Sequence, residues 1–326
     1  MAEINMVQAV NLALARALED DPSVVVLGED VGINGGVFRA TEGLYNRFGQ
    51  DRILDTPLAE ALIAGMSVGM AAAGLRPVSE IQFMGFIYPT IDQLECHASR
   101  LRNRTRGRLS CPMVIRAPYG GGVHAPEHHS ESREAMLAHI PGLRVVIPSS
   151  PSRAYGLLLA AIRDPDPVVF LEPKKLYRAN AEHVEDDGIA LPMDTGFVLR
   201  EGDDVSLVTW GAMVQESFAA AATLSTRGIE AEIIDVSTLN PFDPEQVLAS
   251  VEKTGRCVII HEAVRTGGFG SEIGATIAEH GLMSLLAPVK RVTAPDTVVP
   301  LAKLESCFMP GADSIVQAAT DLMAYS

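Results

Sequence analysis

Short runs of apolar, mostly β-branched residues alternate along the chain with longer stretches of helical periodicity. This alternation is typical of repeated strand–helix units built on a mainly parallel sheet. Several of the predicted strands are unbroken apolar runs, which indicates that helices cover both faces of the sheet. In the first part of the chain the pattern predicts strands at 24–27, 78–83, 113–116, 144–147 and 168–171, with helices at 5–19, 57–73, 88–106 and 152–163.

A polar, acidic and irregular stretch follows near residue 177 and ends near residue 196. After it the alternation starts again, with strands predicted at 205–209, 231–236 and 257–261 and helices over 212–226 and from residue 244. We therefore predict two three-layer α/β domains with mainly parallel sheets, residues 1–180 and 197–326, joined by a linker at 181–196. The length of 326 residues suits two domains that each bury a full apolar core.

The net charge of the chain excludes some classes of function. The chain has 26 Lys and Arg against 41 Asp and Glu, a formal net charge of −15. A body this acidic repels phosphate backbones and anionic lipid, so neither nucleic-acid binding nor membrane binding is expected. Residues 196–326 carry 17 acidic and 8 basic side chains. This excess forms either a solvated surface or a docking face for a basic partner.

The cysteines, the N-terminal residues and the absence of a long apolar stretch indicate a cytoplasmic protein. Four cysteines lie far apart without a CxxC pair, which argues against disulfides and a zinc knuckle and favours a reducing compartment. The N-terminal residues lack the pattern of a secretory signal. The longest weakly polar stretch, 61–75, is shorter than the roughly 20 residues of a membrane helix. We therefore expect a soluble, cytoplasmic chain.

The segment DTPLAE at residues 55–60 leads into a helix of small apolar residues with no further charge before Arg76. Thr56 suits the cap and Pro57 the first helical position, which leaves Glu60 one residue beyond the place of a capping carboxylate. We expect this helix to be buried all round. A carboxylate at its start then needs a specific partner or a raised pKa, unless Glu60 simply accepts hydrogen bonds from backbone amides.

Three histidines and a glutamate follow a run of three glycines. His124, Glu127, His128 and His129 match no spacing of a zinc site, and the glycines and Pro126 indicate a loop. We favour a glycine-rich loop that brings an imidazole into a cleft for proton transfer, with metal ligation as the alternative.

Two other patterns have ordinary interpretations. Residues 267–274 hold a glycine run that invites a nucleotide-binding interpretation, but it begins too far from the preceding strand for a dinucleotide fingerprint. Close backbone packing is favoured there. A second set of residues, arginines in alternate positions, would spread around a helix and indicates a solvated or subunit-facing surface: Arg100, Arg102, Arg104, Arg106 and Arg108.

Taken together, the chain closely resembles the β subunit of the thiamine-diphosphate-dependent decarboxylating component of 2-oxo acid dehydrogenase complexes. The resemblance implies the pyrimidine-binding and C-terminal domains of transketolase-like enzymes. It covers nearly the whole chain, in the order and spacing of that family, through LGEDVG (27–32), GGVFRATEGL (35–44), DRILDTPLAE (51–60), RPVSEIQFMGFIYPTIDQ (76–93), PMVIRAPYGGG (112–122), HHSES (128–132), PGLRVVIPSSP (141–151), AIRDPDPVVFLEPKKLYR (161–178) and LAPVKRVTAPDTVVP (286–300).

The resemblance also implies roles for single residues. Glu60 would hydrogen-bond the aminopyrimidine ring nitrogen of the cofactor and so promote loss of the thiazolium proton. Phe86 would stack on the aminopyrimidine, and Gln82 would line the same pocket. His129 would move protons during decarboxylation or acyl transfer, whereas His128 falls where the family varies and receives no role. A potassium site is implied at Met113, Ala161, Ile162, Asp164 and Asp166.

Part of the family's cofactor site is missing from this chain. The GDG segment that holds diphosphate and Mg²⁺ is absent, and Gly202-Asp203-Asp204 comes nearest to it. The resemblance therefore implies an α subunit that supplies Mg²⁺ and the other half of the site, in an assembly of two α and two β chains. It also implies docking of the acidic C-terminal domain on a lipoyl acyltransferase core.

The substrate and the activity leave alternatives open. We predict oxidative decarboxylation of a 2-oxo acid with reductive transfer of the acyl group to lipoamide. Residues 120–132 resemble the pyruvate branch of the family, while EIQF and EPKKLYR also suit the branched-chain branch, whose substrate is 2-oxoisovalerate. Less favoured alternatives are a nucleotide-dependent dehydrogenase that uses residues 267–274 and a non-catalytic assembly subunit.

Overall fold

The computed structural model describes residues 3–325, which divide into two compact units. The first unit contains residues up to 119 together with 136–193. The second contains 120–135 and the chain from 194 onward. The predicted boundaries at 180 and 197 assigned the loop with His124, His128 and His129 to the first domain. In the structure this loop, within residues 120–135, belongs to the second unit. The predicted division into two domains and a linker stays a prediction, and its outermost residues, 1–2 and 326, lie outside the described residues.

The first unit is built on six parallel strands that lie side by side in the order β6-β7-β5-β4-β2-β3. Most residues of these strands are buried on both faces, which explains their continuous apolar sequences. A separate antiparallel pair, β1 (Glu3–Asn5) with β8 (Ala181–His183), places a short strand in the predicted linker. The six strands are β2 (Val24–Gly28), β3 (Ile53–Asp55), β4 (Arg76–Glu80), β5 (Val114–Tyr119), β6 (Arg144–Val146) and β7 (Val168–Pro173).

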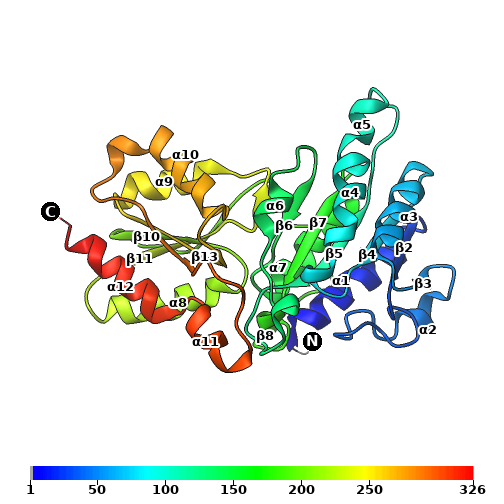
Figure 1. The fold of residues 1–326 in the computed structure, drawn as a ribbon, viewed down its shortest axis with the longest axis horizontal. Helices are drawn as coiled ribbons and strands as arrows, with labels where there is room; N and C mark the ends of the chain where they lie inside the picture. The colour runs from blue at the N-terminus through cyan, green and yellow to red at the C-terminus, as the bar shows by residue number, and fades with distance from the viewer. Residues whose placement is uncertain (1–2, 326) are drawn as a thin grey trace. The chain divides into compact units, whose positions relative to one another are not determined.

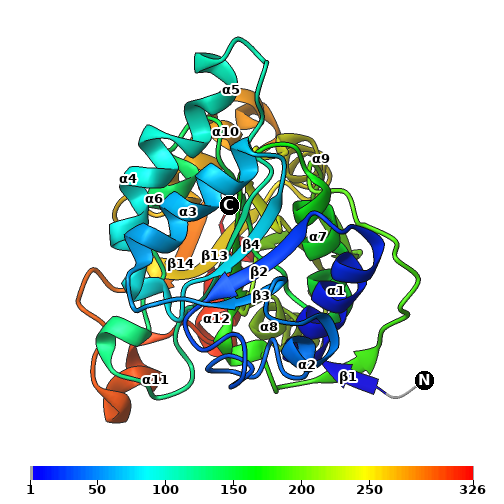
Figure 2. The same cartoon turned by 90° about the vertical axis from the view of Figure 1, so that its right-hand side faces the viewer.

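Helices cover both faces of this sheet (Figures 1 and 2). On one face α1 (Met6–Asp20) packs along α7 (Pro151–Arg163), and on the other α3 (Glu60–Ala72) packs along α4 (Tyr88–Cys96). The predicted helix at 88–106 is broken in the structure, because α4 ends at Cys96. Short elements complete the unit: α2 (Leu44–Phe48), η1 (Met84–Phe86), η2 (Ala98–Arg100), α5 (Leu101–Arg104) and η4 (Lys174–Leu176). The residues of α6 (Glu134–Ala138) are divided, with 136–138 in the first unit and 134–135 in the second.

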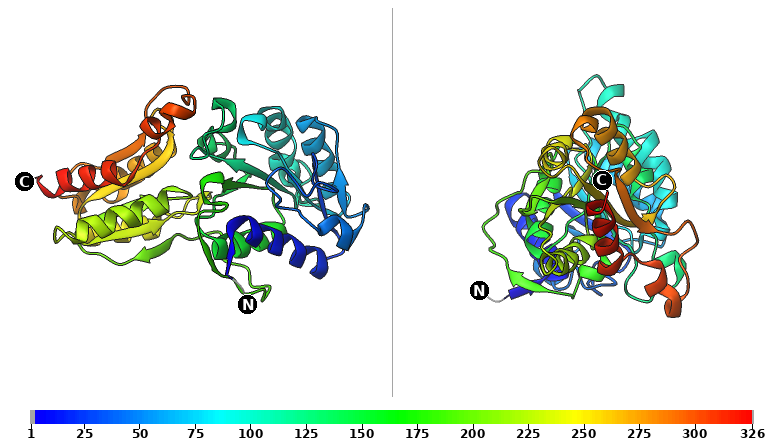
Figure 3. Two further views of the ribbon diagram at one scale, coloured as in Figure 1. Left: turned by 90° about the horizontal axis from the view of Figure 1, so that it is seen from below. Right: turned by 90° about the vertical axis from the view of Figure 1, so that its left-hand side faces the viewer.

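The second unit has a five-stranded sheet in the order β14-β13-β10-β11-β9, parallel except for the edge strand β9. Helices α8 and α12 lie across one face, as Figure 3 shows, and α9 and α10 cover the other (Figure 1). The predicted α/β alternation is therefore confirmed in both units. The elements are β9 (Phe197–Arg200), β10 (Val205–Thr209), α8 (Met213–Ser225), β11 (Ala231–Asp235), β12 (Thr238–Asn240), α9 (Pro244–Thr254), β13 (Cys257–Val264), α10 (Gly270–His280), β14 (Lys290–Ala294), α11 (Glu305–Phe308) and α12 (Ala312–Met323), with η3 (Glu127–His129), η5 (Leu282–Ser284) and η6 (Ala302–Leu304).

Candidate functional site

Glu60 is the first residue of α3, at the carboxyl edge of the sheet of the first unit. The prediction that Thr56 caps this helix was wrong, because the N-cap is Ala59 and no side chain caps it. Instead the backbone N–H of Thr56 donates to the carbonyl oxygen of Gly28 at 2.9 Å, which extends the pairing of β3 with β2. Glu60 is half-buried and lies where the helix dipole favours a negative charge.

The expectation that α3 is buried all round was also wrong for the chain alone. Ile63, Ala64, Ser67 and Ala71 face the interior, whereas Leu62 is 46% exposed. The helix therefore presents apolar side chains on its outer face. The helix lacks charged residues after Glu60 because both its inner face and its outer face are apolar.

A second carboxylate, Glu29, lies beside Glu60 and was missed by the sequence reasoning. Glu29 directly follows β2 and is 7% exposed. Burial, then the negative charges of Glu60 and Asp30, raise the pKa of Glu29. Its Oε1 atom is buried without a hydrogen-bond partner among the described residues, and so is the Oγ1 atom of Thr56. Unsatisfied buried polar atoms at the start of α3 indicate a place where a polar ligand is received.

Gln82 and Phe86 follow the neighbouring strand β4 and therefore belong to the same edge of the sheet. Phe86 closes the short helix η1 and is half-buried. Its ring meets Phe83 edge-on, with centroids 5.7 Å apart, and Phe83 in turn meets Phe38 at 5.4 Å. This row of aromatic rings gives the edge an apolar wall.

Farther along the same edge lies a fully buried charge cluster that the sequence reasoning did not identify. The guanidinium of Arg116, 0% exposed, donates two hydrogen bonds to Glu172, at 2.6 and 2.9 Å, and one to Glu80 at 3.0 Å. The hydroxyl of Tyr177 donates to Glu172 at 2.5 Å. Burial disfavours the charge of Arg116, but the carboxylates of Glu172 and Glu80 outweigh it and raise the pKa of Arg116. Burial also raises the pKa of Glu80.

His129 lies in the second unit, at the end of the short helix η3, and is half-buried. The loop that carries it is closed at its base, because the N–H of Gly120 donates to the carbonyl oxygen of Glu131 at 2.9 Å. Within the loop, the N–H of His129 donates to Pro126 and that of Ser130 to Glu127. His128 is exposed. The structure thus groups Glu60, Gln82 and Phe86 in the first unit and places His129 in the second.

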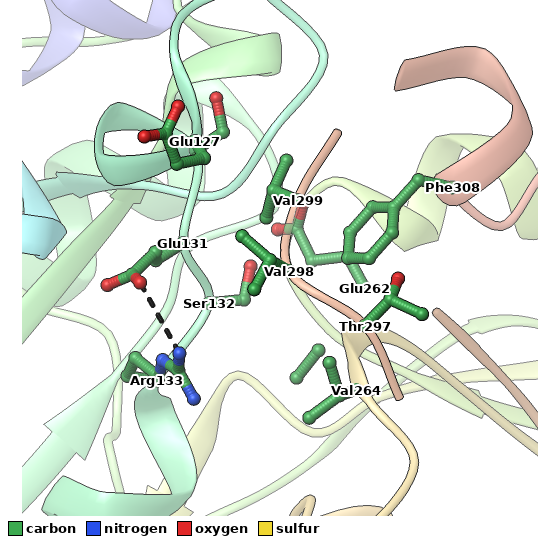
Figure 4. A pocket seen from close by; sticks show the side chains of 12 residues that line it. Glu127, Glu131, Ser132, Arg133, Glu262, Val264, Thr297, Val298, Val299 and Phe308 are labelled. Atoms are coloured by element: carbon green, nitrogen blue, oxygen red, sulfur yellow. Dashed lines mark hydrogen bonds and ion pairs between the residues drawn. The ribbon is translucent and has the colours of Figure 1, made fainter. Parts of the chain in front are cut away.

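The loop with His129 forms one wall of a hollow in the second unit (Figure 4). The hollow measures about 460 Å³ with its open mouth. On the loop side the lining is polar, and Arg133 contacts Glu131 at 3.3 Å. The opposite wall is apolar, with Val298, Val299 and Phe308. The remaining lining residues are Glu127, Ser130, Ser132, Glu262, Ala263, Val264 and Thr297.

Glu134, near this hollow, is a buried acid with an unusual pKa. Its side chain is 0% exposed, and neither carboxylate oxygen completes a hydrogen bond of normal geometry among the described residues. Burial, joined by the negative charge of Glu262, raises the pKa of Glu134 to about 7. The Trp210 indole lies close enough to offset part of this rise.

The stability of the chain is therefore expected to depend on Glu134 between pH 4.5 and pH 7. In this range the unfolded chain has released the proton, since its glutamates titrate near 4.5, while the folded chain keeps it. Stability is then lost as the pH rises, by up to ~3 kcal/mol. In urea unfolding, Glu134→Gln should raise the free energy of unfolding by the full amount of this loss at pH 8. At pH 5 it should raise the free energy of unfolding by less than about 1 kcal/mol. The exposed Glu279→Gln serves as control, and equal effects of Glu134→Gln at both pH values would contradict the expectation.

The glycine-rich segment near residue 267 is explained by packing. A Cβ atom at Gly268 would come within 2.7 Å of the His261 ring, and one at Gly270 within 2.8 Å. His261 is fully buried and stacks on Trp210 with ring centroids 5.2 Å apart. Burial lowers the pKa of His261 to about 4. The favoured interpretation of close backbone packing is therefore confirmed.

The implied potassium residues lie before β5, at the end of α7 and in the turn that follows: Met113, Ala161, Ile162, Asp164 and Asp166. Carbonyl oxygens at a helix end suit a cation. Two of them already accept hydrogen bonds from the guanidinium of Arg76, at 2.9 Å from Ile162 and 3.1 Å from Asp164. A metal ion in this place would share these oxygens with Arg76.

Residues 3–325 contain neither a metal-binding cluster nor a membrane-spanning helix. Histidine, cysteine and carboxylate side chains form no group of three or more placed for a metal ion. No helix there is long and apolar enough to cross a membrane.

Comparison with known proteins agrees with the α/β fold of the two units. Residues 2–180 match the family "Transketolase, pyrimidine binding domain", and residues 194–315 match "Transketolase, C-terminal domain". A solved structure described as "Split gene transketolase, inactive beta4 tetramer" shares the fold, with a TM-score of 0.82, 23% identity and 99% of each chain covered.

Curated relatives are more closely similar over the whole length. The "Pyruvate dehydrogenase E1 component subunit beta" of Bacillus subtilis is 47% identical over 325 residues, which cover 100% of both chains. The protein of the same name from Staphylococcus aureus (strain MW2) is 46% identical over the same length, and that from Staphylococcus epidermidis is 48% identical over 319 residues, 98% of both chains. The chain therefore belongs to the family of pyruvate dehydrogenase E1 component β subunits, within the transketolase-like enzymes.

Proposed function

We propose that the chain takes part in the oxidative decarboxylation of pyruvate and the reductive transfer of the acyl group to lipoamide, with thiamine diphosphate as cofactor. The observation that carries this proposal is the start of α3, where Glu60 lies beside Glu29 and two buried polar atoms lack hydrogen-bond partners within residues 3–325. The relatives named for pyruvate dehydrogenase support the same activity.

The residues of this edge fit the pyrimidine half of the cofactor. Glu60 would hold a proton against a ring nitrogen, and Phe86 would stack on the ring face without needing a hydrogen bond. Gln82 would line the same pocket from the neighbouring strand. When bound, thiamine diphosphate supplies the electron sink for loss of carbon dioxide. The polar atoms of Glu29 and Thr56 would then find partners.

The diphosphate half of the cofactor site is proposed to lie on an α subunit, which would hold Mg²⁺. The sequence has no GDG segment, so this chain offers no counterpart. The apolar outer face of α3, with Leu62 46% exposed, is a surface of the kind that a second chain covers. We propose an assembly of two α and two β chains, inactive without α.

The same proposal extends to three further features. The acidic excess of residues 196–326 would dock on the basic binding domain of a lipoyl acyltransferase core. Potassium would bind at the end of α7 through the oxygens that Arg76 also contacts. A cytoplasmic location is supported by the unpaired cysteines, which the structure shows as free thiols.

Reconstitution tests the function directly. The chain would be co-expressed with candidate α subunits, the mass of the assembly measured, and thiamine diphosphate titrated into it. Turnover would then be compared for pyruvate and 2-oxoisovalerate. A preference for pyruvate supports the proposal, a preference for 2-oxoisovalerate assigns the branched-chain alternative, and full activity of the isolated chain refutes the shared site.

His129 is proposed to move protons in decarboxylation or acyl transfer. We expect His129→Ala in the reconstituted enzyme to lower turnover by at least about a hundredfold and to leave thiamine diphosphate binding intact, because a positioned imidazole contributes that much to proton transfer. The exposed neighbour His128→Ala is the matched control and should retain most activity. Equal losses in both variants, measured as kcat with pyruvate, would assign the effect to the loop and not to the imidazole.

A further inference from the structure

The three consecutive glycines before the histidines run against two buried carboxylates of the second unit. The N–H of Gly121 donates to Glu262 at 3.2 Å, and the N–H of Gly122 donates to Glu305 at 2.8 Å. Glu305 also accepts from the backbone N–H of His124 at 2.9 Å and contacts its Nδ1 atom at 2.9 Å. Three backbone N–H groups of one short segment thus donate to two carboxylates from distant parts of the chain.

The glycines are required by this arrangement. Gly120 and Gly122 have φ of +81° and +86°, which glycine adopts at little cost. A Cβ atom at Gly120 would lie 2.5 Å from a carboxylate oxygen of Glu262, and one at Gly121 would lie 2.8 Å from the sulfur of Met309. The backbone can therefore approach the carboxylates only because side chains are absent.

His124 adds a conformational cost that the carboxylate offsets. Its φ is +57°, a left-handed conformation that a residue with a Cβ atom rarely adopts. Alternating left-handed residues turn successive N–H groups toward one side and form a concavity that binds anions. Here the anion is the side chain of Glu305, which is 2% exposed, so water does not compete for these bonds.

The segment after His124 is a compact turn that depends on this anchor. The hydroxyl of Ser130, a residue 2% exposed, donates to the carbonyl oxygens of Ala125 at 3.3 Å and Pro126 at 3.2 Å. His129 lies inside this turn, which is joined to the unit at its far end by the bond between Gly120 and Glu131. The position of His129 is therefore determined by two sets of bonds. Glu262 and Glu305 hold the backbone before the turn, and the bond between Gly120 and Glu131 closes the loop after it.

We propose that Glu305, assisted by Glu262, is a positioning residue for His129, acting through the backbone amides of Gly121, Gly122 and His124. Neither carboxylate needs to touch the substrate. The inference rests on the proposed function in giving His129 a catalytic role, but the anchoring of the loop is independent of that role.

Amide hydrogen exchange of the full chain tests the anchoring without any activity. Glu305→Ala is expected to speed exchange in peptides covering 120–131 by about tenfold or more, because hydrogen bonds to a buried charge are lost. Glu216→Ala is the matched control, since Glu216 also accepts from a backbone N–H, that of Ala312 at 3.1 Å, and both residues lie outside residues 120–131. Unchanged exchange in the loop of a folded Glu305 variant would overturn the proposal.

A double-mutant cycle in the reconstituted enzyme tests the link to His129. Glu305→Ala should lower kcat by about tenfold or more with little change in KM for pyruvate, and should lower it hardly further when His129 is already alanine. Equal losses in both backgrounds would overturn the positioning role. If Glu305→Ala does not fold, Glu305→Gln, which keeps one accepting oxygen, is measured in the same way. If exchange in residues 120–131 is faster in Glu305→Ala but the wild-type assembly is inactive, the proposed function is refuted. The anchoring of the loop by Glu305 is then still supported.

Discussion

Replacement of Glu60 by glutamine is expected to reduce pyruvate turnover of the reconstituted enzyme by at least about a hundredfold, because a glutamine cannot hold and release the proton that the pyrimidine nitrogen requires. Binding of thiamine diphosphate should persist in part, since the diphosphate would be held by the α subunit. The exposed Glu42→Gln in the same unit is the control and should keep full activity. Steady-state turnover and calorimetric titration of the cofactor measure the two effects separately.

The same substitution has a consequence that needs no activity. The negative charge of Glu60 is the second largest cause, after burial, of the raised pKa of Glu29. Glu60→Gln removes that charge, so the pKa of Glu29 should fall toward its ordinary value, as carboxyl resonances followed by NMR would report. A Glu60→Gln enzyme that keeps its turnover would contradict the assigned role, whatever happens to Glu29.

Replacement of Arg116 by leucine is expected to lower the free energy of unfolding by about 3–5 kcal/mol at pH 8, because it leaves the carboxylates of Glu80 and Glu172 buried without their cation. Arg116→Lys should lose less, since the charge stays but the two parallel bonds to Glu172 cannot form. Urea unfolding followed by circular dichroism measures both variants.

A solvent-exposed ion pair provides the control for this experiment. Arg100 pairs with Glu95 at 3.4 Å, and both side chains are 49% exposed, so Arg100→Leu should cost less than about 1 kcal/mol. The loss in Arg116→Leu should also shrink as the pH falls, because burial raises the pKa of Glu80 and favours its uncharged form. A loss as small as that of Arg100→Leu would show that the cluster contributes little to stability.

The buried acids show why sequence reasoning reached only part of the site. Glu60 drew attention because it stands at the start of an apolar helix and outside the capping position. Glu29 carries a comparable signal, an acid directly after a buried apolar strand, and could have been found from it. Arg116 gives no such signal, since its partners Glu80 and Glu172 are 36 and 56 residues away.

The start of α3 shows where local preference failed. Thr56 and Pro57 have the residue types of a helix start, and local reasoning placed the helix there. In the structure the N–H of Thr56 bonds to Gly28 across the sheet, so Thr56 extends the pairing of β3 with β2 and the helix begins only at Glu60. A hydrogen bond to a neighbouring strand outweighed the local preference.

The amino-acid order alone determined the α/β architecture, because strands buried on both faces must be apolar and the helices between them must alternate apolar and polar positions. It also determined the family and the residue types that chemistry needs. Only the tertiary structure decided which polar groups meet, as with the backbone N–H of Gly122 and the carboxylate of Glu305, 183 residues apart. Such pairs depend on how strands and loops are brought together in space, and no spacing along a chain encodes that distance.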